Sequence, residues 1–258
     1  TGEVLYPGFE LDQLCAYPIA LERYLDATGD SSILEEPAVA RGLPLLLGKL
    51  EERRHPSVPL FWTFLDPSDD PAPMPYLTYC NVLAWRALLA LARLRAGDPA
   101  RLSMLAATVA AAVRDRCVVD GPFGPMFCWA TDLQGGHELY DNPAGSLLLL
   151  PHLGFCPLGD VTFHNTVRWI YSAHNPHFTG AGRFPGIGGR HSPGPWVLGA
   201  CNALLAERRE EAAALLLAPM DGGLACETVD PDTGQVRTGA AFATAAGFLA
   251  YALRSAFS

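Results

Sequence analysis

The sequence lacks an excess of basic residues. Of its 258 residues, 18 are Lys or Arg and 27 are Asp or Glu, which gives a formal net charge of −9. Because nucleic-acid-binding surfaces are basic, this charge argues against a nucleic-acid partner. The sequence also has no apolar run of 18 residues, and no signal peptide opens it. We therefore expect a cytoplasmic protein without a membrane partner.

Patterns typical of metal sites, disulfides and phosphate binding are missing too. The seven cysteines are scattered singly, without CxxC or Cys/His ligand spacing, so neither a zinc site nor a disulfide framework is expected. His174 and His177 have the spacing of one helix face, but Pro176 between them breaks a helix. There is no glycine-rich phosphate loop, no GxSxG motif and no βαβ rhythm. We expect neither a metal nor a cofactor.

The sequence is rich in helix-forming residues. Half of the residues are hydrophobic, and alanine and leucine are frequent, which favours helices and a large core. Ser32 and Glu35 predict a capping box ahead of the second helix. A hairpin with a DPDTG turn is expected within residues 222–239. Apolar residues at three- and four-residue steps predict a first helix over residues 11–29 and a second that ends at about residue 50. Further helices are predicted over 76–95, 100–117, 144–153 and 160–172, with two over 196–217 and one over 240–253. The helix over 76–95 is apolar on most sides and is expected to be buried, and Asp98 with Pro99 predicts the start of the helix over 100–117.

Long loops rich in glycine and proline separate these helices, over residues 118–142 and 173–194. Paired helices with small hairpins inserted between them indicate an all-α fold. They favour an (α/α) toroid over a four-helix bundle. We expect a single domain over residues 1–258.

Acidic residues outside the helices stand beside aromatic residues. Asp69 and Asp70 are adjacent in a proline-rich turn, where mutual repulsion favours one protonated carboxyl group. Aromatic faces stack on sugar rings while carboxylates bind hydroxyl groups, and glycoside hydrolysis needs two carboxyl groups. A carbohydrate enzyme and a helical scaffold with solvated acidic loops both fit this pattern. The residues concerned are Glu10, Asp12, Asp66, Asp69, Asp70, Asp132, Glu138, Asp141 and Glu227, with Phe9, Trp62, Phe64, Tyr76, Trp129 and Tyr140.

Four segments, in the same order, resemble glycoside hydrolase family 125, the metal-independent exo-α-1,6-mannosidases. ELDQLCAYPIALERYLDATGD (residues 10–30) is similar to the family's ELDSLCYP helix, and PSDD (67–70) to its RPSDD turn. YDNPAGSLLLLPHLG (140–154) is similar to DDANVPSLLSLPYLG. NPHFTGAGRFPGIGGRH (175–191) is similar to the family's NP…G…GIG-x-x-H loop. A shorter match, LACETVDPDTG, stands where the family has a glutamate in a GFMHESF-like hairpin.

The resemblance implies an (α/α)6-toroid enzyme that removes terminal α-mannose with inversion, using an aspartate acid and a glutamate base. The acid is then Asp69 or Asp70, with Asp69 preferred, and Glu227 is the base. In an inverting pair the two carboxyl groups stand roughly 6.5–9.5 Å apart. An oligosaccharide or small glycoside is the expected partner. The residues expected to hold the substrate are Asp12, Tyr76, Tyr140, Asp141, Asn142, Asn175, His191 and Trp196. Asp12 and Asp141 also fit helix caps.

The sequence departs from the family pattern at three places. It begins near the ELDSLC-like helix, so the toroid is expected to be shortened or incomplete. One aspartate of DDANVPS is absent at Tyr140, and Leu65–Asp66 replaces the Phe–Arg that precedes PSDD. One alternative is a related toroid glycosidase that acts on a glucoside or glycosyl-glycerate. Another is a non-catalytic sugar-binding module or split-enzyme fragment, which self-associates through an exposed apolar edge.

Overall fold

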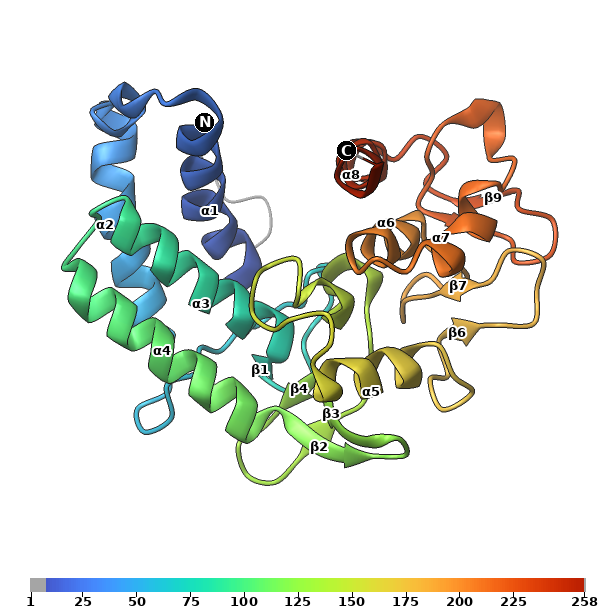
Figure 1. Cartoon of the computed structure of the whole chain (residues 1–258), viewed down its shortest axis with the longest axis horizontal. Helices are drawn as coiled ribbons and strands as arrows, with labels where there is room; N and C mark the ends of the chain where they lie inside the picture. The colour runs from blue at the N-terminus through green and yellow to red at the C-terminus, as the bar shows by residue number, and fades with distance from the viewer. Residues whose placement is uncertain (1–7, 258) are drawn as a thin grey trace. The chain divides into compact units, whose positions relative to one another are not determined.

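The computed structural model describes residues 8–257, and Figure 1 shows their helices and short strands along the chain. The chain divides into two compact units. Unit 1 contains the residues up to 118 together with 130–138, and unit 2 contains 119–129 and the residues from 139 onward. No helix within residues 8–257 is long and apolar enough to cross a membrane. The expectation of one domain stays a prediction.

Unit 1 is built on four helices, α1 (Leu11–Thr28), α2 (Pro37–Glu52), α3 (Thr78–Arg93) and α4 (Pro99–Arg116), drawn from blue to green in Figure 1. Helix α3 packs against both α1 and α4, and its apolar residues are buried on most sides. A helix that is apolar all round needs neighbours on several faces, so the predicted burial of α3 is confirmed. Asp98 accepts a hydrogen bond from the Ala100 N–H, and Pro99 opens α4, as expected.

The predicted capping box at Ser32 and Glu35 is wrong. The Asp30 side chain accepts the Ser32 N–H and opens a short 3₁₀ turn, η1 (Ser31–Leu34). Helix α2 then begins at Pro37, whose missing N–H needs no cap. Helices α1 and α2 both continue through their internal prolines, Pro18 and Pro44.

A three-stranded antiparallel sheet joins distant parts of unit 1. Its order is β1 (Tyr76–Leu77), β4 (Ala130–Thr131) and β5 (His137–Glu138), and Tyr76 pairs with Thr131. The third helix therefore starts two residues later than the 76–95 that the sequence predicted, because Tyr76 and Leu77 pair as a strand. The loop over 118–142 contains the predicted hairpin, formed by β2 (Val118–Gly121) and β3 (Gly124–Phe127).

Unit 2 contains α5 (Val161–Ile170), α6 (Val197–Leu205), α7 (Arg209–Leu216) and α8 (Ala243–Phe257). Every residue of α6 is buried, and α6 packs against α7 and α8. Two strand pairs lie in the connections: β6 (Phe178–Thr179) with β7 (Gly186–Ile187), and β8 (Thr228–Val229) with β9 (Val236–Thr238). The second pair is the hairpin predicted from the DPDTG turn. A 3₁₀ turn, η4 (Asp221–Gly223), precedes it.

The helix predicted over residues 144–153 is wrong. The structure has two 3₁₀ turns there, η2 (Pro143–Gly145) and η3 (Leu147–Leu149). Asn142 and Ser146 each accept the N–H two residues further on, and Ser146 itself is extended. Such local side-chain bonds compete with helix hydrogen bonds, so they interrupt a segment whose apolar pattern alone is helical.

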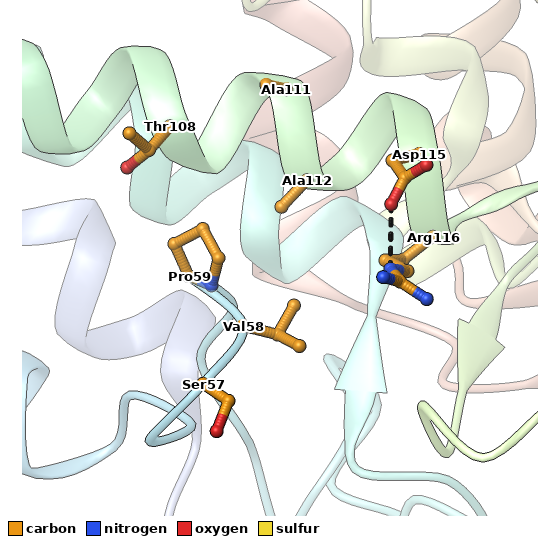
Figure 2. A pocket seen from close by; sticks show the side chains of 8 residues that line it. All are labelled: Ser57, Val58, Pro59, Thr108, Ala111, Ala112, Asp115 and Arg116. Atoms are coloured by element: carbon orange, nitrogen blue, oxygen red, sulfur yellow. Dashed lines mark ion pairs between the residues drawn. The ribbon is translucent and has the colours of Figure 1, made fainter.

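Figure 2 shows a surface pocket of about 370 Å³ in unit 1, between α4 and the loop of residues 57–59. Its polar groups include the ion pair of Asp115 and Arg116, whose charged atoms are 2.7 Å apart. The residues expected to bind or cleave a substrate do not line it.

Candidate active site

One candidate group, in unit 1, consists of five carboxyl residues and is here called the acidic cluster: Glu10, Asp12, Asp66, Asp69 and Asp70. Backbone contacts fix its two segments to each other. The Phe9 carbonyl accepts the N–H groups of Phe64 and Leu65 at 3.0 and 3.1 Å. The buried Thr63 hydroxyl accepts the Leu11 N–H at 3.1 Å and donates to the Leu65 carbonyl at 2.7 Å. The start of α1 is therefore held against residues 63–65, which lead into the acidic turn.

Asp66 organises this turn. Its Oδ1 accepts both the N–H and the hydroxyl of Ser68 at 2.8 Å. Its N–H donates to the Asp70 carbonyl at 2.8 Å, and the Asp69 N–H donates to the Asp66 carbonyl at 3.0 Å. This closed turn holds Asp69 at a φ of 63°, a left-handed conformation that side-chain-bearing residues rarely adopt. Strained backbone of this kind is found at functional sites, and the Asp69 side chain is exposed.

Two carboxyl groups of the acidic cluster, those of Glu10 and Asp12, have raised pKa values. Burial, followed by the negative charges of Asp12 and Asp69, raises the pKa of Glu10 to about 7. Burial also raises the pKa of Asp12 to about 6, with smaller contributions from Asp66 and Asp69. The Glu10 carboxyl hydrogen-bonds to Asp69, and Gln13 donates to Glu10. Such a proton-holding group is what a general acid requires.

A separate candidate group, in unit 2, is the Glu227 cluster, formed by Glu227, His191 and Trp196. The Glu227 N–H donates to the Gly239 carbonyl at 3.1 Å, and its own carbonyl accepts the Val197 N–H, also at 3.1 Å. The His191 Nε2 lies 3.6 Å from Glu227 Oε1. The His191 ring meets Trp196 edge-on at 5.3 Å. The structure thus brings together three residues that the sequence analysis placed at the site.

Tyr140 is a buried anchor of the loop that carries His191. Its ring contacts Trp129 and His177 edge-on, with centroids 5.2 and 4.9 Å away. The Arg190 N–H donates to the Tyr140 hydroxyl at 3.1 Å, and the Arg190 guanidinium lies 4.1 Å over the ring. Burial and the charge of Arg190 lower the pKa of His177. Sequence reasoning missed Arg190, although it directly precedes the predicted His191.

Three further residues expected to hold the substrate are buried and bonded within the protein. Asp141 accepts the Ser146 hydroxyl and the Leu147 N–H, each at 2.8 Å. Asn142 accepts the Ala144 N–H at 3.2 Å. Asn175 donates to the Ile170 carbonyl at 2.9 Å and accepts the His177 N–H at 3.0 Å. The N-cap residues of η2 and η3 are Asn142 and Ser146, so Asp141 is not itself an N-cap, although its carboxyl group accepts the first N–H of η3. Substrate binding by these residues stays a prediction.

Asp12 and Tyr76 lie in unit 1. Asp12 is in the first turn of α1, and its Oδ1 is buried without a hydrogen-bond partner. Tyr76 meets the His55 ring edge-on at 5.8 Å, and burial raises the pKa of its hydroxyl. Within residues 8–257, no three His, Cys, Asp or Glu side chains form a group that could hold a metal ion.

A family model matches residues 48–251, well over half of the chain, and it is described as metal-independent alpha-mannosidase, GH125. The chain belongs to this family. It is therefore a glycoside hydrolase of the family 125 alpha-mannosidases. The matched range contains Asp69, Asp70 and Glu227, whereas Glu10 and Asp12 precede it. No curated protein sequence matches the chain.

Two solved structures share the fold of this family 125 chain. One is the metal-independent alpha-mannosidase of Streptococcus pneumoniae in a non-productive complex with alpha-1,6-mannobiose, with a TM-score of 0.85 and 20% identity. The match covers 98% of this chain and 70% of that one. The other is a bacterial glucoamylase complexed with acarbose, with a TM-score of 0.65, 15% identity and coverage of 97% and 41%. The predicted helical, (α/α)-toroid class of fold is confirmed by these matches.

Proposed function

We propose that this family 125 glycoside hydrolase is an exo-acting α-mannosidase that releases terminal α-1,6-linked mannose with inversion. The observation that carries the proposal is the match of the alpha-mannosidase family model over residues 48–251. The Streptococcus pneumoniae relative in complex with alpha-1,6-mannobiose supports an oligosaccharide substrate and this linkage.

Asp69 is proposed as the general acid, with Asp70 as the alternative. The exposed carboxyl group of Asp69 lies in the turn that Asp66 closes and is hydrogen-bonded to Glu10. In this role Asp69 donates its proton to the glycosidic oxygen as the bond to the anomeric carbon breaks. The pKa of Glu10, the neighbour of Asp69, is raised to about 7, mainly by burial.

Glu227 is proposed as the general base. It accepts a proton from the water that attacks the anomeric carbon on the face opposite the leaving group, which inverts the configuration. Its backbone N–H and carbonyl are both hydrogen-bonded, to Gly239 and Val197, and its half-buried carboxylate faces the His191 ring. His191 and Trp196 are proposed to bind the sugar beside it, through hydroxyl contacts and through the indole face.

The roles are separated by comparing substrates whose leaving groups differ. Glu227→Gln is expected to lose about a thousandfold in kcat on any α-mannoside, because the base is needed whatever the leaving group. It should retain substrate binding in calorimetry. Asp69→Asn is expected to lose as much on mannobiose but little on 2,4-dinitrophenyl α-mannoside, whose leaving group departs without protonation.

The matched control is Asp232→Asn, which removes an exposed carboxylate from the turn of the β8–β9 hairpin. It should keep the wild-type rate. If Asp70→Asn, and not Asp69→Asn, loses kcat on mannobiose but not on the dinitrophenyl mannoside, the acid is Asp70. Near-wild-type turnover by Glu227→Gln would refute the base assignment. Faster hydrolysis of aryl α-glucosides than of aryl α-mannosides would contradict the proposed sugar.

A further inference from the structure

An aromatic surface of unit 1 surrounds an arginine, and we call it the Arg53 platform: Phe9, Arg53, Trp62 and Phe64. The Arg53 guanidinium carbon lies 4.2 Å from the centroid of the Phe9 ring and 4.3 Å from that of Trp62. These two rings meet edge-on at 5.6 Å. Phe64 is 55% exposed, whereas the other three side chains are half-buried. The platform therefore presents aromatic carbon and a cation to solvent.

The Arg53 cation has no carboxylate partner within the described part of the chain, and its Nε is a buried donor without a hydrogen-bond acceptor. Arginine side chains of unit 1 such as Arg86 and Arg93 instead pair with carboxylates of α1. An unsatisfied donor is costly, and the two rings hold this guanidinium in place. Because the Nε is buried, only the terminal NH₂ groups of the guanidinium can meet an acceptor supplied from outside, and the two rings orient them.

The platform is continuous with the acidic turn. The Trp62 N–H donates to the Arg53 carbonyl at 2.9 Å, and the Phe64 N–H donates to the Phe9 carbonyl at 3.0 Å. The Phe64 carbonyl accepts the Ala72 N–H at 2.9 Å, which closes the base of the loop that carries Asp69. The same extended segment, residues 61–66, therefore supports both the platform and the proposed acid.

We propose that the Arg53 platform binds sugar rings on the leaving-group side of the substrate, beyond the second sugar of an α-mannoside. The inference rests on the proposed function and extends it to a preference for longer oligosaccharides. The C–H face of a pyranose packs on aromatic carbon, and its hydroxyl oxygens accept hydrogen bonds from a guanidinium. A sugar ring can therefore use both the exposed Phe64 ring and the terminal N–H groups of Arg53.

The test compares kcat/KM for α-1,6-mannobiose and for α-1,6-linked mannotetraose. Phe64→Ala is the leading variant because the Phe64 ring is exposed, so we expect its removal to leave the fold intact. It should lower the ratio of kcat/KM for mannotetraose to kcat/KM for mannobiose about tenfold, which is the effect of losing one apolar contact in a binding site. Trp62→Ala should lower the ratio as well, and Trp62→Phe should restore much of it because a ring remains beside Arg53.

Phe257→Ala is the matched control, since Phe257 is 65% exposed and lies under the guanidinium of Arg209 at 4.7 Å. It should leave the ratio unchanged. An unchanged ratio in Phe64→Ala and Trp62→Ala, or a ratio that falls equally in Phe257→Ala, would overturn the proposal.

A binding measurement separates the platform from the proposed function. If the wild type hydrolyses no mannoside, the proposed function fails, and mannotetraose is titrated calorimetrically into the wild type and Phe64→Ala. Binding that is about tenfold weaker in Phe64→Ala, the cost of one lost apolar contact, supports the platform. Equal affinity, or no binding by the wild type, overturns it.

Discussion

Two variants of Asp141 distinguish the role of this residue as a hydrogen-bond acceptor for η3 from a substrate-binding role. The residue is 1% exposed, and its two oxygens accept the Ser146 hydroxyl and the Leu147 N–H. Asp141→Asn keeps an oxygen for the Leu147 N–H and removes the ionisable group. Asp141→Ala removes both acceptors and leaves two buried donors unpaired.

The effect of Asp141 on stability depends on pH. Burial raises its pKa from 3.8 to about 7, although the bonds from Leu147 and Ser146 oppose the shift. The folded protein thus holds this proton more tightly than the unfolded chain does. The resulting stabilisation is fully present below pH 3.8 and is lost as the pH rises through about 7. A pKa difference of this size corresponds to about 4 kcal/mol in the free energy of unfolding, at roughly 1.4 kcal/mol for each tenfold change in proton affinity.

The assay is urea unfolding of the wild type and Asp141→Asn at pH 4 and pH 8, followed by circular dichroism. The other ionisable groups are the same in both proteins. The difference between the two proteins in how the free energy of unfolding changes with pH therefore reports Asp141. Between pH 4 and pH 8, the free energy of unfolding of the wild type should fall by about 4 kcal/mol more than that of Asp141→Asn. Asp141→Ala should cost about 2–4 kcal/mol at pH 4 through its unpaired donors.

Two results would refute this reasoning. Equal pH dependence in the wild type and Asp141→Asn would show that burial does not hold the carboxyl group neutral. A stable Asp141→Asn protein that has lost mannosidase turnover would show that Asp141 acts on the substrate rather than only as an acceptor for η3.

The remaining predictions concern the residues that position the proposed acid and base. Gly239 has a φ of +57°, and an added Cβ would lie 2.6 Å from the Glu227 Cβ, so Gly239→Ala should displace the base and lower kcat. The loss should be about a hundredfold, as for a 1 Å misplacement, whereas Gly29→Ala, at φ +70° with open space around it, should keep the wild-type kcat. Asp66→Ala should cost about 2 kcal/mol of unfolding free energy in urea titrations. It should also lower kcat by releasing Asp69, and Asp66→Asn should restore both; equal kcat values in all Asp66 variants would contradict its positioning role.

Much of the helical fold could be predicted from periodicity and end signals. The apolar spacing of α3 and the Asp98–Pro99 start of α4 are local features, and both appear as expected. The predictions that failed are those in which a side chain competes with the helix for a backbone N–H group, which the spacing of apolar residues does not show. Asp30, rather than Ser32, accepts the first N–H ahead of α2, and Ser146 interrupts an apolar segment that would otherwise be helical.

The candidate site was less accessible to sequence reasoning. Asp69, Asp70 and Glu227 came from the order of family-like motifs, and residue spacing alone did not assign their roles. The role of Asp66 depends on a closed turn, although the DPSD sequence, with a side-chain acceptor two residues before a serine, is a signal for it. The close approach of Gly239 to Glu227 is a tertiary contact, which no local pattern reports.

The most direct test of the central claim is a proton NMR time course of α-1,6-mannobiose hydrolysis by the wild type and Glu227→Gln. An inverting α-mannosidase releases β-mannose first, and α-mannose appears only later through mutarotation. We predict prompt β-mannose from the wild type and none from Glu227→Gln. Initial release of α-mannose, or no hydrolysis by the wild type, would contradict the account.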